Sequence, residues 1–196
     1  MCIRDSISFE PAFAVEVEWT LLASMARLGR PDGGSAYLRL STRPVQQSLA
    51  DVPTDPAARE RRRRQVVAGA YTLRACAEPD VTIVGMGAMV TEALEAAERL
   101  ADLDIAAEVV CVTSAGLLFE ALQARSGHGD GESWILDQVF PAHRAAPMVT
   151  VLDGHPHTLT FLSTINRVHT VALGVSTFGQ VGALPDVYRL HGIDTD

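Results

Sequence analysis

The chain has 196 residues, of which 47% are hydrophobic, enough for one ordinary domain or for one domain and part of another. No apolar run approaches the ~18 residues that span a bilayer, so we expect a cytoplasmic protein without membrane contact. The formal net charge of −8 argues against general nucleic-acid binding. Because all sixteen basic residues are arginine, this chain holds neither a Schiff-base lysine nor a phosphate-loop lysine.

The first part of the chain predicts a helix and a strand without a core of their own. Residues 1–6, MCIRDS, have no structural periodicity, and we expect them to be a leader that is not native to the protein. Residues 11–28 predict an amphipathic helix and residues 36–40 a strand. The helix repeats apolar side chains at intervals of four, at Phe13, Val17, Leu21 and Met25.

The next segment is rich in proline and then in arginine. Residues 42–56 contain three prolines and no apolar period, which is typical of a connecting segment. Residues 59–64, RERRRR, are compatible with a basic patch, but a solvated linker helix fits the acidic, proline-rich context better. We therefore expect a linker over residues 49–64.

From residue 65 the pattern alternates strands and helices, and this predicts an α/β fold. Strands that are apolar on both faces and joined by helices indicate a mostly parallel sheet covered on both sides. The predicted strands lie near 69–74, 81–85, 105–112, 147–152 and 168–173. The predicted helices lie near 88–103, 115–125, 157–166 and 183–191.

Two motifs partly match the residue patterns of cofactor and metal sites. Gly85-Met86-Gly87 follows a strand and precedes a helix, as in a dinucleotide-binding turn, but Val90 stands where the fingerprint requires a third glycine. The stretch DGHPH at residues 153–157 offers three metal ligands, but a turn followed by a helix start explains it better, and no fourth ligand is marked out. We assign no catalytic, cofactor-binding or metal-binding residue to this chain.

One location is nevertheless favoured for a ligand. In an open parallel sheet, ligands collect beyond the carboxyl ends of the strands. The residues expected to line such a strand-end crevice are Gly85, Gly87, Ser114, Asp153, His155 and His157.

Five segments, in order, carry a resemblance to a known family. They are SFEPAFAVEVEWTLLASM, GGSAYLRLSTRPVQQ, VTSAGLLFEALQ, APMVTVLDGHPHTLTFL and ALGVSTFGQVGALPDVYRLHGIDT. Together they resemble the thiamine-diphosphate-dependent transketolase-like superfamily, and most of all the homodimeric, single-chain first component of pyruvate dehydrogenase. One departure is Val181, which replaces the serine of the family pattern F-G-Q-S-G and removes a hydroxyl that could cap the following helix.

The resemblance implies a domain organisation. Residues 7–48 are similar to the C-terminal end of the pyrimidine-binding domain, and residues 65–196 are similar to the transketolase-like C-terminal domain. The chain then reads as a C-terminal fragment. Since the natural cover of residues 7–41 would be missing, we expect these residues to pack only partly on the rest and to leave Phe13, Trp19 and other apolar side chains exposed.

The resemblance also implies an activity for the complete protein. That activity is decarboxylation of pyruvate and transfer of acetyl to lipoamide, with thiamine diphosphate and Mg²⁺ as cofactors and a dihydrolipoyl acetyltransferase as partner. The fragment would be inactive, with a structural role in the homodimer. Two alternatives stay open: a transketolase that moves two-carbon ketol units between sugar phosphates, and a non-catalytic ligand-binding α/β module.

Overall fold

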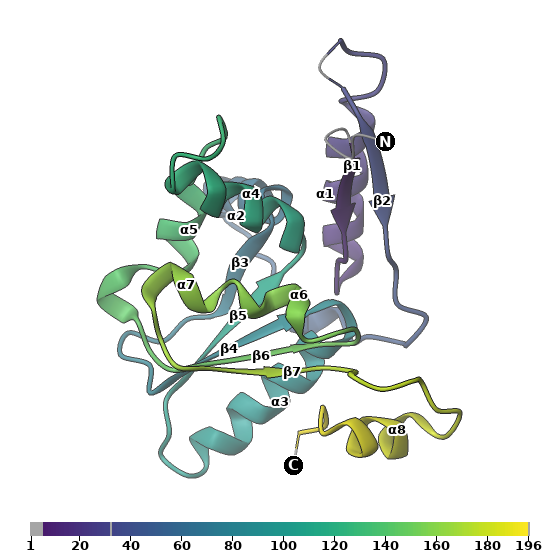
Figure 1. Ribbon diagram of the computed structural model, residues 1–196, viewed down its shortest axis with the longest axis vertical. Helices are drawn as coiled ribbons and strands as arrows, with labels where there is room; N and C mark the ends of the chain where they lie inside the picture. The colour runs from purple at the N-terminus through teal and green to yellow at the C-terminus, as the bar shows by residue number, and fades with distance from the viewer. Residues whose placement is uncertain (1–5, 32, 196) are drawn as a thin grey trace.

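The computed structural model describes residues 6–31 and 33–195, so most of the leader expected at residues 1–6 lies outside the described residues. The fold is an α/β unit with a mostly parallel sheet, as the sequence predicts, and a smaller β–α–β unit stands beside it (Figure 1). The small unit consists of β1 (Ser6–Phe9), α1 (Ala14–Met25) and β2 (Ser35–Leu38). Its two strands pair in parallel and form a separate sheet.

The main sheet has five strands in the order β3-β5-β4-β6-β7. They are β3 (Ala70–Arg74), β4 (Val81–Met86), β5 (Ala107–Val112), β6 (Met148–Leu152) and β7 (Thr170–Leu173). Four strands are parallel, and the edge strand β3 is antiparallel to β5. Strand β4 has its sequence neighbour β5 on one side and β6 on the other, so the connections reverse direction between β4 and β6.

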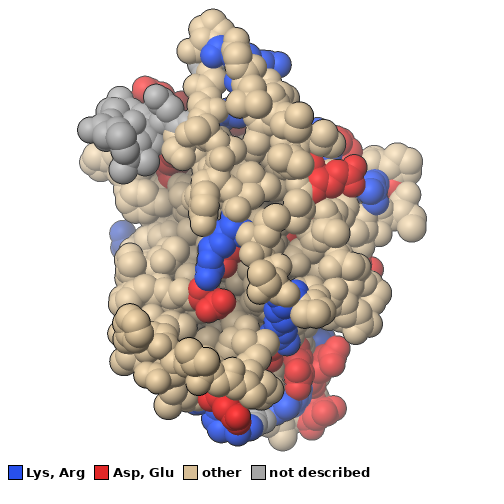
Figure 2. Space-filling model, turned by 90° about the vertical axis from the view of Figure 1, so that its right-hand side faces the viewer, with Lys and Arg blue, Asp and Glu red and all other residues tan. Residues whose placement is uncertain are grey.

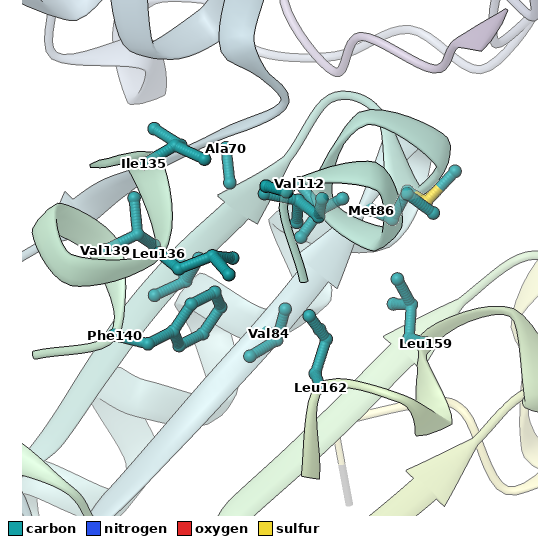
Figure 3. Close-up of a cluster of buried hydrophobic side chains, with 14 of the residues drawn as sticks. Ala70, Val84, Met86, Val112, Ile135, Leu136, Val139, Phe140, Leu159 and Leu162 are labelled. Atoms are coloured by element: carbon teal, nitrogen blue, oxygen red, sulfur yellow. The ribbon is translucent and has the colours of Figure 1, made fainter. Parts of the chain in front are cut away.

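One face of the main sheet is covered by the helices that follow β5 and β6. These are α4 (Ala115–Arg125), α5 (Trp134–Val139), α6 (His157–Thr160) and α7 (Ser163–Asn166). Their aliphatic side chains, including Leu136 and Leu159, point at Val84 and Val112 of the sheet (Figure 3). Because every strand residue from 107 to 112 is buried, the sheet requires cover on its other face as well.

The opposite face is covered by α3 (Val90–Ala101), which follows the short turn η3 (Gly87–Met89), and by α8 (Leu184–His191) near the C-terminus. Ala93 and Ala97 of α3 pack on Ile83 and Val109 of the sheet. Small alanine side chains allow the helix to lie close to the strands.

The small unit is joined to the main one by a shared apolar cluster. Phe13 and Trp19 contact a cluster that includes Val66 of α2 (Pro56–Ala68) and Tyr71 of β3. Phe13 is 1% exposed and Trp19 is 5% exposed. The expectation that these two side chains stay exposed is therefore wrong, because α2 and β3 provide the cover that the sequence alone did not reveal.

The second half of α1 differs from the first. Leu21, Leu22 and Met25 are 44–57% exposed, and Leu28 beyond the helix is 63% exposed. Exposed apolar side chains on residues 7–41 are thus present, as expected, in the second half of α1 and also at Tyr37 and Leu40 on and after β2.

The segment expected to be a linker contains two elements, η2 (Gln47–Ala50) and helix α2. Asp55 begins α2, since its side chain accepts a hydrogen bond from the backbone N–H of Ala58, and the left-handed Gly69 ends it. Its arginines are not simply solvated. The guanidinium groups of Arg59, Arg62 and Arg64 lie over the rings of Trp19, Tyr71 and Trp134, respectively.

The helix predicted over residues 157–166 is broken into α6 and α7. Three hydroxyls in this segment donate hydrogen bonds to carbonyls three residues earlier: Thr160 to His157, Ser163 to Thr160 and Thr164 to Phe161. Such local bonds compete with regular helical ones and favour short turns.

Candidate functional site

A crevice lies at the point where the sheet connections reverse. Strands β4 and β6 are parallel neighbours, with Met86 opposite Leu152, so both present their carboxyl ends at the same edge. A cavity of about 200 Å³ opens there, and it is lined by Gly87 after β4 and by Asp153 after β6. This is the place where open α/β sheets ordinarily hold ligands.

The other wall of the crevice comes from the small β–α–β unit. Glu10 follows β1, and its backbone N–H donates to the carbonyl of Thr113 beyond β5 over 2.8 Å. Arg39 follows β2, and its backbone N–H donates to the carbonyl of Phe9 over 2.9 Å. The first bond holds Glu10 against the main sheet, and the second holds Arg39 beside β1. Both side chains therefore lie at the strand ends of the main sheet.

Three ion pairs, made by two arginines, organise the crevice. Arg39 Nη1 lies 2.5 Å from Glu10 Oε1, and Arg39 Nη2 lies 3.7 Å from Asp153 Oδ2. Arg43 Nη1 lies 2.5 Å from Glu92 Oε1. In Figure 2, acidic and basic side chains lie next to one another near the middle of the face, and further charged groups lie toward its upper right and lower edge. The guanidinium groups are therefore already partnered.

Burial shifts the acid–base properties of two groups in the crevice. It raises the pKa of Glu10, although the neighbouring guanidinium of Arg39 opposes the shift. It also raises the pKa of the Tyr188 hydroxyl, against the opposing effect of Arg43, whose guanidinium lies 5.6 Å from the centre of the Tyr188 ring. The hydroxyl of tyrosine is ordinarily protonated at neutral pH, and the raised pKa keeps the Tyr188 hydroxyl so to a higher pH. The crevice thus offers paired ions and a neutral phenol.

Gly87 is required by the geometry of this crevice. Its φ of +57° lies in the left-handed region, and a Cβ at this position would lie 2.5 Å from Glu10 Oε1. A larger residue would displace Glu10 from Arg39.

Of the six residues expected at the strand ends, the structure brings two, Gly87 and Asp153, into the crevice. Gly85 is buried inside β4, where a Cβ would lie 3.0 Å from Val90 Cα of helix α3. It allows the close packing of helix on strand for which the dinucleotide fingerprint uses its third glycine. Ser114 is 1% exposed and begins α4, because its Oγ accepts from the N–H of Leu117.

His155 and His157 lie on the surface after β6. Both side chains are exposed, and their Nδ1 atoms lie 2.6 Å apart. Two histidines fall short of a zinc site, which takes at least three protein ligands. Within residues 6–31 and 33–195, no group of three or more His, Cys, Asp or Glu side chains could hold a metal ion.

A larger cavity of about 440 Å³ lies between α3 and the sheet, and its walls are mostly aliphatic. It has few groups that could orient a ligand. We therefore regard the smaller, charged crevice as the candidate site, since specific ligand sites combine apolar walls with several convergent polar groups.

Sequence reasoning missed Glu10, Arg39, Arg43 and Tyr188. All four lie within segments quoted for the resemblance: Glu10 in the first, Arg39 and Arg43 in GGSAYLRLSTRPVQQ and Tyr188 in the last, so the resemblance pointed at their neighbourhood. The sequence does not show that the small unit packs over the strand ends of the main sheet, and this packing is what brings the four residues together.

Comparison with known proteins identifies the family. A model of the transketolase-like C-terminal domain matches residues 69–194. The chain belongs to this family. The match begins one residue before β3 and ends after α8, so it covers the whole main sheet.

Individual relatives extend the likeness into the small unit. Over 174 residues, 89% of this chain, the sequence is 30% identical to the chromosomal transketolase of Cupriavidus necator, of which it covers 22%. A crystal structure of a Pichia stipitis transketolase variant superposes with a TM-score of 0.70 at 18% identity, over 97% of this chain and 24% of that one. A split-gene transketolase described as an inactive β4 tetramer superposes with a TM-score of 0.66 at 21% identity, over 97% and 55%.

These comparisons confirm the transketolase-like superfamily and the fold class. The relatives are transketolases, and they do not support the expectation that pyruvate dehydrogenase is the closest likeness. The chain spans only about a quarter or less of the curated relative and of the Pichia stipitis structure. In the part of the chain that the structure describes, no helix is long and apolar enough to cross a membrane.

Proposed function

We propose that this chain is the C-terminal part of a thiamine-diphosphate-dependent transketolase, which moves two-carbon ketol units between sugar phosphates. The observation that carries the proposal is the 30% identity to the Cupriavidus necator transketolase over 89% of the chain. That length includes at least part of the small β–α–β unit, which lies outside the family-model match at residues 69–194.

The proposed substrates are sugar phosphates. This chain has a fold similar to that of the Pichia stipitis transketolase. Crystal structures of that enzyme or its variants include complexes with fructose 6-phosphate, sedoheptulose 7-phosphate and xylulose 5-phosphate. The proposal assigns the same class of substrate to the complete enzyme.

The cofactors of the proposed enzyme, thiamine diphosphate and Mg²⁺, do not fit the described residues of this chain. A diphosphate-bound Mg²⁺ takes several oxygen ligands, and no suitable group of three acidic side chains occurs among residues 6–31 and 33–195. In the crevice, Glu10 and Asp153 face Arg39, and Glu92 is paired with Arg43. We therefore place the cofactor, and all chemistry that depends on it, outside the described residues of this chain.

The proposed role of this chain is structural. Residues 7–48 would be the end of the pyrimidine-binding domain, and the main sheet would support that domain through the crevice. The Arg39–Asp153 pair, the backbone bond from Glu10 to Thr113 and the shared cluster around Phe13 join the two units. A homodimeric enzyme is proposed as well, because the family resemblance implies one and a split-gene relative is described as a tetramer.

The test uses the enzyme encoded by the complete gene from which this chain derives. Transfer of a ketol unit from xylulose 5-phosphate to an aldose phosphate would support the proposal. Decarboxylation of pyruvate with reduction of an artificial electron acceptor, without ketol transfer, would overturn it in favour of pyruvate dehydrogenase. Absence of both activities in folded, cofactor-loaded enzyme would overturn both assignments.

A further inference from the structure

A buried carboxyl group lies at the contact between the two units. Glu16, in the first turn of α1, is 1% exposed. Its Oε2 accepts hydrogen bonds from the backbone N–H groups of Ala12, over 2.6 Å, and of Phe13, over 3.0 Å. These bonds satisfy two N–H groups that the helix start leaves free, and they shape the turn that precedes α1.

The other oxygen of the same group reaches the main sheet. Glu16 Oε1 accepts from the hydroxyl of Tyr71 on β3 and lies 3.5 Å from Cys111 Sγ on β5. A single side chain of the small unit therefore contacts two strands of the main one. The contact lies inside the apolar cluster that contains Phe13 and Trp19.

No cation neutralises this group directly. Among the described residues, no arginine or histidine forms an ion pair with Glu16. Arg62 of α2 places its guanidinium over the Tyr71 ring, 4.3 Å from its centre. An ionised carboxylate that is buried without a paired cation destabilises the fold.

The neutral acid keeps a bond to each of these partners except Cys111. A protonated Glu16 keeps Oε2 as acceptor for Ala12 and Phe13, and its O–H donates to the Tyr71 hydroxyl oxygen in place of the bond that Tyr71 donates to the carboxylate. Burial raises the pKa of Glu16, although its bonds from Tyr71 and from the backbone oppose the shift. Burial also raises the pKa values of Tyr71 and Cys111 well above normal, so both remain neutral.

We propose that Glu16 is a proton-linked latch: its neutral carboxyl group holds the β1–α1–β2 unit on the main sheet, and its ionisation loosens this contact. The contact then contributes its full stabilisation at pH values below the ordinary pKa of glutamate. This stabilisation is lost as the pH rises through the higher pKa of Glu16 in the folded protein. The latch concerns the contact between two units of this chain and does not depend on the transketolase assignment.

The experiment follows Trp19 in the full chain. The only other tryptophan, Trp134, is replaced by phenylalanine, so that the emission reports on Trp19, which is 5% exposed when the unit is docked. Between about pH 4 and pH 9, the emission maximum should move to longer wavelength as Glu16 ionises. Glu16→Gln should hold the maximum at the short-wavelength position throughout, because an amide stays neutral. Glu18→Gln is the matched control, since Glu18 is exposed on the same helix, and it should keep the transition.

Carbon-13 NMR of the Glu16 carboxyl group provides a second measurement, which does not depend on the folding of a variant. A titration midpoint above that of free glutamate supports the latch, and a midpoint at or below it overturns it. An emission transition that survives in Glu16→Gln also overturns the proposal. So does a folded Glu16→Gln protein whose Trp19 is exposed at low pH.

Discussion

Replacing Phe13 by alanine tests whether the two units fold as one. Phe13 precedes α1, is 1% exposed and packs in a cluster with Trp19, Val66 and Tyr71. Truncating a buried phenylalanine removes its apolar surface from the core and leaves a cavity, at a typical cost of about 3–5 kcal/mol. For a chain of this size, about 2–4 °C per kcal/mol makes the expected fall in Tm roughly 6–20 °C.

The assay is urea unfolding followed by circular dichroism, with Leu22→Ala as the matched control. Leu22 lies on α1 but is 57% exposed, so its truncation should change stability by only ~0.5 kcal/mol. If the small unit folded separately, Phe13→Ala would leave the main transition in place. A Phe13→Ala protein that unfolds at the same urea concentration as Leu22→Ala would refute the shared core.

Three further predictions follow from the same structure. Gly87→Ala should lose more stability in urea than Gly127→Ala. Both glycines have positive φ, which strains an alanine by about 1–2 kcal/mol, but only at Gly87 would the added Cβ also meet a neighbour, Glu10. Equal losses of stability would contradict this close approach. Arg144→Ala should cost about 3–5 kcal/mol, because it leaves Glu108, whose side chain is 3% exposed, without its partner at 2.9 Å. Since burial raises the pKa of Glu108 and Arg144 opposes this, the loss should grow as pH rises, and a loss that shrinks would contradict the assignment. Calorimetry on this chain should find no saturable thiamine diphosphate binding, and micromolar binding would show that the cofactor site lies within it.

The sequence predicted those elements that show a pattern within a few neighbouring residues. The apolar β-branched strands of the main sheet lie within a few residues of their predicted positions, because burial on both faces leaves a continuous apolar run. Helix α4 begins and ends as predicted at residues 115 and 125, since Ser114 caps its start. Strand β1 was missed because its first residue lies in the stretch set aside as a leader. Helix α5 was missed because six residues are too short to show a helical period.

The sequence by itself determined the α/β class, the succession of the main strands along the chain and the superfamily, because each depends on residue patterns along the chain. The tertiary structure decided which surfaces meet. Periodicity shows that one side of α1 is apolar, but it does not show that α2 and β3 cover Phe13 and Trp19. The crevice depends on the same docking, since Glu10 and Arg39 reach Asp153 only when the small unit lies across the strand ends. Contacts between residues more than a hundred positions apart are set by packing, which no local pattern encodes.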